Sequence, residues 1–386
     1  MNSLDTKFSD YTRSLEATQR RRALPSTDLT GLVADFSHND YLGLARDLAL
    51  LAAATAAGRT YGVGATGSRL LSGNLAIHEG LESRIAQGKG TECALIFNSG
   101  YQANATALAA LLDKKVLGAE SLVFADKLNH ASLHHGCQLA GVHQHRYRHN
   151  DLAHLRELLE KFRDDPRPKF LVAETVFGMD GDALDMPAIA ALADEFKLFL
   201  FLDEAHATGV YGEQGYGLAA GWLDGGRRGA VMGTFSKAIG ASGAYVACSE
   251  AVRDYLLSRC TGFIYSTALS PLVIGAVQAA WEKLPNLHEQ RQALQARVEQ
   301  FRQAVQGMGF DTGTSTTHIV PLIVGEESTA LALKAFLLAR GLLTSAVRPP
   351  TVPPHTARVR VALSVSHTDA QIAALLAALS DWRKAA

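Results

Sequence analysis

Six short apolar runs, separated by helical patterns and glycine-rich turns, limit the fold of this chain more than any other feature. The runs are 94–97, 121–125, 169–174, 198–203, 230–234 and 244–249. Their apolar residues are continuous rather than alternating, which is typical of parallel strands that are buried on both faces. Helical patterns lie between them at 101–114, 154–165 and 186–196. The sequence therefore predicts an α/β fold with a mostly parallel sheet flanked by helices.

The pattern changes after residue 271, which predicts a second and smaller domain. The remaining chain holds a long helical region over 272–308, apolar runs over 318–325 and 358–365, and a final helix. We therefore predict a large domain over 46–271 and a small C-terminal α+β domain over 272–386.

Residues 1–45 are predicted to form an N-terminal helix and arm. Four apolar residues recur there at helical spacing: Leu4, Phe8, Tyr11 and Leu15. This spacing predicts an amphipathic helix that ends near Pro25. The segment mixes acidic and basic residues and lacks an apolar core of signal-peptide length, so we expect neither a signal peptide nor a membrane span.

Composition narrows the class of protein. Of the 386 residues, 47% are hydrophobic and 19% are charged, as in a soluble globular protein with a large core. The formal net charge of −1 gives no reason to expect a nucleic-acid partner or a charged membrane surface. The four cysteines form no CxxC pair, which argues against a disulfide framework or a zinc site and favours a reducing compartment. We therefore expect a cytoplasmic protein.

Ligands of open α/β sheets bind beyond the carboxyl ends of the strands, so the residues that follow each run are candidates for a site. Ser99, which follows the first run, is a good helix N-cap. Gly100 lets the backbone approach a ligand closely, and Tyr101 opens a helix whose amide groups can bind a phosphate. A capped helix without any ligand explains the same residues.

His130 follows the second run by five residues, and its imidazole could stack on a flat aromatic ring. A solvent-facing loop histidine is the alternative interpretation. Five further histidines lie nearby: His134, His135, His143, His145 and His149. Their spacing matches no compact ligand set, so we interpret them as surface residues and expect no metal site.

Asp203 ends the strongly apolar fourth run, and His206 follows three residues later. An ionised carboxylate that is buried at a strand end needs a cationic or donor partner, because burial without one is too costly. A protonated pyridine nitrogen is such a partner. The alternative interpretation of Asp203 is a carboxylate that caps the following turn.

Lys237 lies among small and apolar residues just after the fifth run. Most lysines are surface residues, but a lysine amine held among apolar groups can form an imine with an aldehyde. Thr234 and Ser236 add hydroxyls for a phosphate. Phosphate donors, a carboxylate for a ring nitrogen, a stacking imidazole and a reactive lysine are together what pyridoxal 5′-phosphate requires. We therefore predict this cofactor, with Lys237 as a catalytic residue.

The sequence also resembles a known family, the α-oxoamine synthases among the fold-type I pyridoxal-phosphate enzymes. The resemblance extends almost from end to end, in HNDYLGL (38–44), GATGSRLLSGN (64–74), DKLNHAS (126–132), ETVFGMDGD (174–182), LDEAHATGVYGEQG (202–215), GTFSKAIGASG (233–243) and IYSTALSP (264–271). Members are acyltransferases that join an amino acid to an acyl-CoA with loss of carbon dioxide and CoA. The resemblance implies an aminotransferase-like fold and this activity.

The resemblance implies roles for the cofactor residues. Lys237 would hold the cofactor and move the substrate proton, and Asp203 would keep the pyridine nitrogen protonated. His206 would donate to the 3′-oxygen, and His130 would stack on the ring. Three residues would hold the phosphate: Gly100, Tyr101 and Thr234. Ser266 and Thr267 resemble residues that reach the phosphate of the partner subunit, which implies a homodimer with shared active sites.

The resemblance also implies a substrate pocket. Arg360 would bind the amino-acid carboxylate with Asn39 close by, although Arg358 shares its strand face and remains an alternative. Arg20 and Thr351 match positions that contact the acyl substrate. The run over 347–368 is most similar to members that use L-alanine and pimeloyl-CoA in biotin biosynthesis.

One position departs from the family pattern. Members usually have serine where this chain has Gly178, so a hydroxyl that would help to hold the cofactor is absent. Gly178 remains among the predicted cofactor contacts through its backbone.

Three groups of alternative functions differ in what they require. The sister activities 2-amino-3-oxobutyrate CoA ligase, 5-aminolevulinate synthase and serine palmitoyltransferase share every cofactor residue and differ in the acyl and amino-acid pockets. An aminotransferase or aldolase on the same fold would not need CoA. A transcription regulator would need a DNA-binding domain, for which the chain leaves no room.

Overall fold

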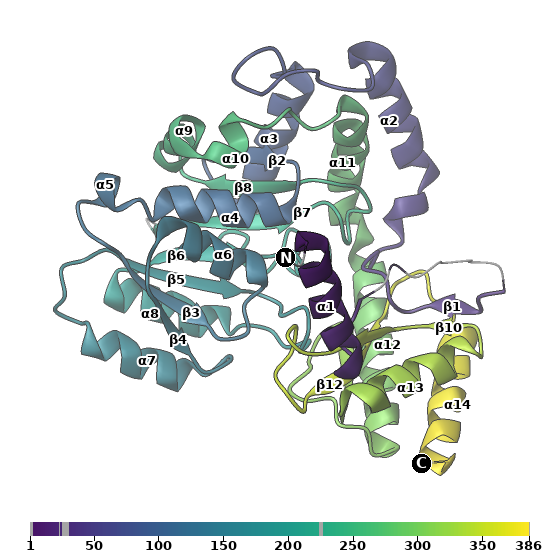
Figure 1. Cartoon of the computed structure of the whole chain (residues 1–386). Coiled ribbons are helices and arrows are strands. Elements are labelled where there is room, and N and C mark those ends of the chain that lie inside the picture. The colour runs from purple at the N-terminus through teal and green to yellow at the C-terminus, as the bar shows by residue number, and fades with distance from the viewer. Residues whose placement is uncertain (1–2, 23, 25–30, 224–226, 386) are drawn as a thin grey trace. The chain divides into compact units, whose positions relative to one another are not determined.

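The computed structural model describes residues 3–22, 24, 31–223 and 227–385 (Figure 1). These form two compact units, which we refer to as the smaller and the larger unit. The smaller unit consists of Met1–His38, Met179–Gly181 and Leu294–Ala386, and the larger unit consists of Asn39–Gly178 and Asp182–Ala293.

A seven-stranded sheet forms the centre of the larger unit (Figure 1). In sheet order its strands are β2 (Cys93–Phe97), β8 (Ala244–Cys248), β7 (Gly229–Thr234), β6 (Phe199–Asp203), β5 (Lys169–Glu174), β3 (Leu122–Asp126) and β4 (Gln144–Tyr147). β8 is antiparallel to both of its neighbours, and the other pairs are parallel. All six predicted runs lie in this sheet, so the predicted mostly parallel α/β fold is confirmed.

β4 was not predicted from the sequence. Its residues QHRY are polar except for the last, and in the described structure it pairs with β3 alone at the edge of the sheet. An edge strand needs no continuous apolar run, because one side of it is not covered by another strand. His145 within the strand and His143 just before it therefore gave no strand signal.

Helices pack on both faces of the sheet. The described α-helices of this unit are α2 (Leu48–Tyr61), α3 (Ala76–Lys89), α4 (Gly100–Leu111), α5 (Lys114–Leu117), α6 (Ala131–Ala140), α7 (Leu152–Lys161), α8 (Met186–Phe196), α9 (Glu250–Arg259), α10 (Thr261–Ile264) and α11 (Pro271–Lys283). Two short 3₁₀ helices, η1 (Leu44–Arg46) and η3 (Leu284–Leu287), join them. α4 and α6 cover one face, and α7 and α8 cover the other.

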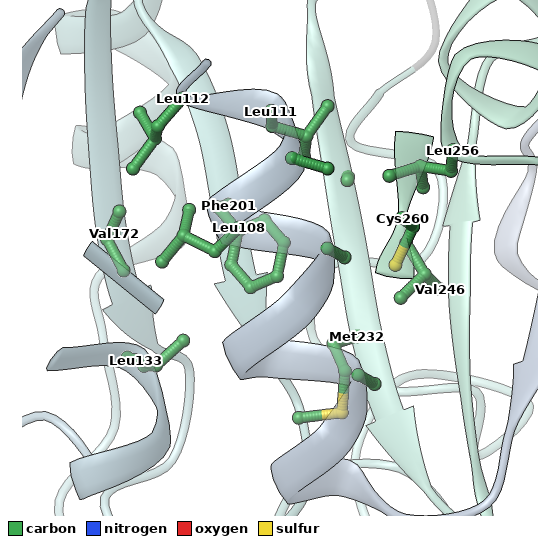
Figure 2. Close-up of a cluster of buried hydrophobic side chains, with 14 of the residues drawn as sticks. Leu108, Leu111, Leu112, Leu133, Val172, Phe201, Met232, Val246, Leu256 and Cys260 are labelled. Carbon is green, nitrogen blue, oxygen red and sulfur yellow. The ribbon is translucent and has the colours of Figure 1, made fainter. Parts of the chain in front are cut away.

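Figure 2 shows the core between the sheet and helices α4 and α6. Side chains of both layers meet there: Leu108, Leu111, Leu112, Leu133, Val172, Phe201, Met232, Val246, Leu256 and Cys260. Each fully buried leucine or phenylalanine of this kind contributes about 1.5–3 kcal/mol to stability. The core therefore fixes α4 and α6, and with them the few polar side chains that these helices carry toward the site.

The smaller unit is an α+β arrangement, as predicted. Its elements are α1 (Leu4–Ala17), β1 (Ala34–Asp35), most of α12 (His288–Gly307), β9 (Ile319–Gly325), α13 (Glu327–Leu338), β10 (Leu342–Leu343), β11 (Ser345–Val347), β12 (Ala357–Ala362) and α14 (Asp369–Ala385). β12 lies between β11 and β9 in an antiparallel three-stranded sheet, and β1 pairs with β10 in parallel. β12 carries both candidate arginines.

The N-terminal helix differs from its prediction, because it ends at Ala17 rather than near Pro25, which lies outside the described residues. The chain leaves the helix at Gln19, whose φ of 55° is left-handed, and the Arg20 and Arg21 amides turn back to the Leu15 carbonyl. The apolar side chains near the start of α1 are all exposed: Leu4, Phe8 and Tyr11. The predicted apolar stripe is therefore present, but no described part of the chain buries it.

The compact units divide the chain differently from the predicted ranges 1–45, 46–271 and 272–386. α11 and the first turns of α12 belong to the larger unit, and Met179–Gly181 belongs to the smaller one. The three ranges stay a prediction as domain boundaries. Within the described residues, no helix is both long enough and apolar enough to cross a membrane.

Candidate active site

The predicted cofactor residues of the larger unit follow one edge of its sheet. β2, β3, β5, β6 and β7 all point their carboxyl ends to the same edge, because β8 reverses direction between β7 and β2. Ser99, His130, Gly178, Asp203 and Lys237 lie at or just beyond these ends. This is the edge at which open α/β sheets bind their ligands.

The N-terminus of α4 and the turn after β7 lie together. Ser99 caps α4 by accepting a hydrogen bond from the Gln102 amide at 3.2 Å, as predicted. A Cβ atom placed on Gly100 would lie 3.6 Å from Cβ of Thr234, which is ordinary contact. The Thr234 and Ser236 hydroxyls lie 2.7 Å apart. Exposed helix amides beside two hydroxyls form a suitable set of donors for a phosphate.

Asp203 is buried at the end of β6, and both of its oxygens accept hydrogen bonds. Oδ2 accepts from Asn104 Nδ2 at 2.7 Å, and Oδ1 accepts from the Ala205 amide at 2.8 Å. The sequence predicted a cationic or donor partner for this carboxylate. The structure provides two neutral donors, which satisfy it in part and leave it suited to a cation as well.

His130 is the N-cap of α6, and its ring packs beside polar and charged groups. Nδ1 lies 2.7 Å from Ser132 Oγ, and the ring meets Tyr101 edge-on with centroids 6.5 Å apart. Burial is the main factor that lowers the pKa of His130; the charge of Asp203 raises this pKa, and the charge of Lys237 lowers it. The imidazole is therefore neutral near pH 7, and its neighbours include both the lysine and the carboxylate.

Glu174 belongs to the same edge, although it was missed in the sequence. It ends β5 directly beside Asp203 of β6, and its carboxylate accepts hydrogen bonds from the His130 amide (2.5 Å) and the Gly178 amide (3.4 Å). Burial, helped by the charge of Asp203, raises the pKa of Glu174 to about 8. A carboxylate at the end of a buried apolar run was the available signal, as it was for Asp203.

His206 explains why this chain has glycine at position 178. The buried Tyr41 hydroxyl lies 2.7 Å from His206 Nδ1 and donates to Asn39 Oδ1 at 2.9 Å. A Cβ atom on Gly178 would lie 2.3 Å from His206 Nε2, well inside contact distance. A serine therefore does not fit while His206 keeps this position. The absence of a serine hydroxyl at position 178 is therefore a consequence of where the His206 ring lies.

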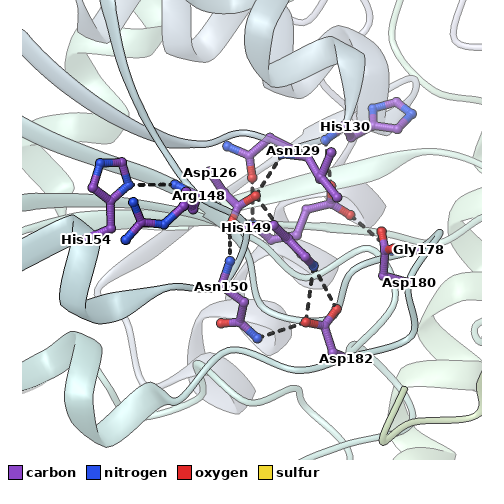
Figure 3. Close-up of polar contacts among 12 residues, drawn as sticks. Asp126, Asn129, His130, Arg148, His149, Asn150, His154, Gly178, Asp180 and Asp182 are labelled. Atoms are coloured by element: carbon purple, nitrogen blue, oxygen red, sulfur yellow. Dashed lines mark hydrogen bonds and ion pairs between the residues drawn. The ribbon is translucent and has the colours of Figure 1, made fainter. Parts of the chain in front are cut away.

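The prediction that His149 is a surface residue is wrong. Figure 3 shows its ring between two carboxylates, with Nδ1 3.0 Å from Asp126 and Nε2 3.1 Å from Asp182. Burial opposes the charge of His149, but the hydrogen bonds to Asp126 and Asp182 outweigh burial and raise its pKa to about 10. Asn150 also donates to Asp182 at 2.9 Å (Figure 3). Histidine spacing along the chain did not reveal these carboxylates, because they come from distant segments.

A buried ion pair involves the residue next to Asp203 in the sequence. Lys89 and Glu204 form a fully buried ion pair, and Glu204 also accepts from the Ala219 amide at 2.6 Å. Glu204 directly follows Asp203 in the chain. The pair ties the end of β6 to α3, and so helps to hold Asp203 in place.

Ser266 and Thr267 lie beyond α10, beside the start of α4. Ser266 Oγ accepts from Gln102 Nε2 at 2.6 Å, and the Thr267 carbonyl accepts from Asn98 Nδ2 at 2.8 Å. Their neighbour Tyr265 is 82% exposed. The structure therefore presents this segment at the surface of the larger unit.

The predicted substrate residues, apart from Asn39, lie in the smaller unit. Arg358 donates to Asp180 Oδ1 at 2.7 Å and to the Met179 carbonyl at 3.1 Å, and it is buried. Arg360 lies two residues along the same strand and is also buried. These contacts engage the Arg358 guanidinium within its own unit.

The predicted acyl contacts Arg20 and Thr351 also have partners within the smaller unit. Arg20 forms an ion pair with Glu327 at 3.1 Å, and the Thr351 hydroxyl accepts from Arg22 at 2.9 Å. The structure therefore gathers the cofactor residues in one unit and the acyl candidates in the other.

Comparison with known proteins places the chain in a family. Residues 33–379 match the family described as aminotransferase class I and II. A curated relative from Gluconacetobacter diazotrophicus, named 8-amino-7-oxononanoate synthase, is 47% identical over 394 residues, covering 99% of this chain and 98% of the relative. The chain therefore belongs to the class I and II aminotransferase family.

Solved structures agree with this assignment. A serine palmitoyltransferase with pyridoxal phosphate bound as an internal aldimine is 27% identical, with a TM-score of 0.88 and coverage of 100% of this chain and 99% of the other. An 8-amino-7-oxononanoate synthase from Francisella tularensis is also 27% identical, with a TM-score of 0.76 and coverage of 92% and 98%. Within the family, these relatives define an α-oxoamine synthase of fold type I, an acyltransferase that depends on pyridoxal 5′-phosphate.

The residues present fit this cofactor. The larger unit offers helix amides and hydroxyls suited to a phosphate, a buried carboxylate suited to a pyridinium nitrogen, a neutral imidazole and a lysine. These are the four chemical requirements of pyridoxal phosphate, and they lie along one edge of one sheet.

Proposed function

We propose that this chain condenses L-alanine with the thioester of pimeloyl-CoA to give 8-amino-7-oxononanoate, CoA and carbon dioxide, as a step of biotin biosynthesis. The relative that is 47% identical and carries the name of this activity supports the proposal. The observation that carries it is the gathering of Asp203, His130 and Lys237 at the carboxyl edge of the sheet of the larger unit.

Each cofactor residue has a proposed task. When bound, pyridoxal phosphate supplies an electron-accepting ring that stabilises negative charge on the amino-acid Cα. Lys237 Nζ would attach the cofactor, and Asp203 would hold its pyridine nitrogen in the protonated form. His206 and the Gly178 backbone would contact the 3′-oxygen. Seven residues would bind or flank the phosphate: Ser99, Gly100, Tyr101, Thr234 and Ser236, with Ser266 and Thr267 reaching the phosphate of a partner subunit.

The substrate steps follow from the same residues. Arg360 would bind the alanine carboxylate, a choice that rests on the resemblance, and Arg358 donates to Asp180 within the smaller unit. Lys237 Nζ would then remove the Cα proton of alanine. The alanine Cα forms a bond to the thioester carbon, CoA leaves as its thiol, the alanine carboxylate leaves as carbon dioxide, and a proton returns to Cα. His130 would donate a hydrogen bond to the developing carbonyl oxygen, a contact often worth a few kcal/mol.

A homodimer is proposed as the working form. Large apolar side chains are exposed along one continuous part of the larger unit and at the partner-facing segment: Leu48, Leu51, Val63, Leu70, Leu71 and Tyr265. A monomer seldom exposes so many large apolar side chains in neighbouring segments, and a second copy of the chain would bury them. We also propose a cytoplasmic location, which the four unpaired cysteines support.

Serine palmitoyltransferase activity is the second candidate. The solved serine palmitoyltransferase has a higher TM-score than the solved oxononanoate synthase, 0.88 against 0.76. Both structures are 27% identical to this chain, so they do not separate the two substrates by sequence. The much higher identity of the curated relative favours the oxononanoate synthase activity.

Thiol release from acyl-CoA by the purified protein tests these proposals. Pimeloyl-, acetyl-, succinyl- and palmitoyl-CoA would each be combined with alanine, glycine and serine. Fast release only with pimeloyl-CoA and L-alanine is the expected result. A preference for palmitoyl-CoA and serine would move the protein to the second candidate, and no release with any pair would contradict the proposed reaction class.

A further inference from the structure

Two buried polar residues that have no assigned role connect Asp203 to His130. Asn104 Nδ2 lies 2.7 Å from Asp203 Oδ2 and 2.9 Å from Ser132 Oγ. Ser132 Oγ in turn lies 2.7 Å from His130 Nδ1. Asn104 is 1% exposed and Ser132 is fully buried, so water does not take part in these contacts. A continuous hydrogen-bonded chain therefore joins the carboxylate to the imidazole.

The close packing of two helices allows these hydrogen bonds to form. Asn104 lies on α4 and Ser132 on α6, two helices that pack closely. A Cβ atom on Gly136 of α6 would lie 2.9 Å from Leu108 Cβ and 3.0 Å from the Asn104 carbonyl oxygen of α4. Glycine inside a helix costs about 1 kcal/mol relative to alanine, and here it allows the close approach of the two helices.

The direction of every hydrogen bond follows from Asp203. With Asp203 ionised, as pairing with a protonated pyridine nitrogen requires, its oxygens only accept. The Asn104 atom that faces it must therefore be the amide nitrogen, because an oxygen at 2.7 Å would be repelled. The second hydrogen of that nitrogen goes to Ser132 Oγ, which accepts it. The single hydroxyl hydrogen of Ser132 is then left for His130 Nδ1.

The backbone gives independent support for the same direction. The Ser132 amide points to His130 Nδ1 at 3.3 Å, so Nδ1 faces two donors. His130 also lies at the N-terminus of α6, where the helix dipole disfavours a positive charge. Asn104 Oδ1 accepts no hydrogen bond from the described residues. Burying the Asn104 amide with an unsatisfied oxygen is costly. We therefore infer that asparagine is present at this position for the two hydrogen bonds that its amide nitrogen donates.

We propose that Asn104 and Ser132 are positioning residues that hold His130 as the neutral tautomer protonated on Nε2, so that this nitrogen is a hydrogen-bond donor. The inference deepens the proposed function and rests on the roles of Asp203 and His130 in it. It explains how the enzyme keeps a donor at His130 while a carboxylate and a lysine lie near it. Five titratable groups of the described residues face this imidazole: Asp203, Lys237, His135, the edge-on Tyr101 and, through the backbone amide, Glu174.

Nitrogen NMR of protein labelled with ¹⁵N-histidine tests the tautomer directly, in the holoenzyme and after removal of the cofactor. Spectra that correlate ring carbon-bound hydrogens with ring nitrogens through two bonds distinguish protonated from unprotonated nitrogens. The signals that are absent from the spectrum of His130→Gln belong to His130. We expect Nε2 protonated and Nδ1 unprotonated at pH 7. Wild-type His130 protonated on Nδ1, or on both nitrogens, would overturn the proposal.

Two variants and one control separate positioning from folding. Ser132→Ala removes the donor to Nδ1 and should give a mixture of tautomers, whereas Ser249→Ala, a helix cap on α9, should leave the His130 signals unchanged. Asn104→Leu removes a donor from Asp203 and should weaken pyridoxal phosphate binding by about tenfold. If Asn104→Leu does not fold, Ser132→Ala still decides the question. An unchanged tautomer in Ser132→Ala would contradict the proposal.

These measurements need no substrate. A failed thiol-release assay with the expected tautomer would overturn the proposed reaction and leave the hydrogen-bonded chain intact. Thiol release by a protein whose His130 is protonated on Nδ1 would support the proposed reaction and overturn the proposed role of Asn104 and Ser132.

Discussion

Two histidines at the carboxyl edge of the same sheet differ in how they are connected to carboxylates: one contacts them directly and the other does so only through intervening side chains. His149 contacts Asp126 and Asp182 directly, and these contacts raise its pKa to about 10. His130 is separated from Asp203 by Asn104 and Ser132, and burial lowers its pKa. Direct contact makes a histidine into a structural cation. An amide and a hydroxyl placed between the two groups keep it neutral and able to donate a hydrogen bond to a ligand.

The largest expected effect comes from replacing His130 and His149 in turn. His130→Leu should lower kcat by about 100-fold, because leucine cannot donate a hydrogen bond to the developing oxyanion, whereas glutamine could. His149→Gln should leave kcat of the folded enzyme within about twofold, because direct contact with carboxylates gives it a structural task only. Steady-state kinetics with thermal unfolding of both variants provides the measurement. Equal losses of kcat would break the comparison.

The second prediction concerns stability and pH. The pKa of His149 is about 10 in the folded protein and about 6.5 in the unfolded chain, so the folded state binds the proton more tightly. The stabilisation is complete below pH 6.5 and is lost as the pH rises through 10. His149→Gln should therefore reduce the free energy of unfolding by about 2 kcal/mol at pH 6 and by much less at pH 10. Urea unfolding at both pH values measures this, and a deficit that grows with pH would contradict it.

The third prediction extends the comparison to the arginine pair of β12. Arg358 is engaged with Asp180, as His149 is with its carboxylates, whereas Arg360 is proposed to bind substrate. Arg360→Gln should raise KM for the amino acid about tenfold or more with little change in stability. Arg358→Gln should reduce stability and leave KM nearly unchanged. Kinetics at varied L-alanine, with the exposed Arg340→Gln as a surface control, decides between them. If Arg358→Gln alone raised KM, the two assignments would be exchanged.

The smallest expected effect concerns a third histidine. Gly178→Ser places a Cβ atom where His206 Nε2 now lies, so His206 must move from Tyr41. We expect pyridoxal phosphate to bind a few-fold more weakly, because the new hydroxyl replaces only part of the lost contact. Titration of the apoenzyme with the cofactor measures the change, with Gly178→Ala as the control that adds the Cβ atom alone. Tighter binding by the serine variant would show that His206 has room to move.

Periodicity was enough to predict every strand of the described sheet except β4, and it indicated the edge of the sheet at which to look for a site. The apolar runs were continuous, so the strands could be placed, and the chemistry then followed from the residues at their ends. Asp203 and Lys237 were proposed as site residues in this way. Glu174 ends a run in the same manner and was overlooked, although its signal was equally strong.

Residues whose meaning depends on distant partners were not predictable. Asn104 and Ser132 are single polar residues in otherwise apolar helices, and only the packing of α4 against α6 brings them together. His149 was misjudged for the same reason, because Asp126 and Asp182 lie far from it in sequence. The sequence shows that glycine at position 178 is unusual for the family. The reason for the glycine is the nearby ring of His206, and spacing along the chain does not show that contact.

The central claim is that the chain joins an amino acid to an acyl thioester with loss of the amino-acid carboxylate. Reaction of the holoenzyme with carboxyl-labelled L-alanine and pimeloyl-CoA tests it most directly, with Lys237→Ala as the inactive control. We expect labelled carbon dioxide and free CoA thiol in equal amounts, and neither product from the variant. Thiol without labelled carbon dioxide, or full activity in Lys237→Ala, would contradict it.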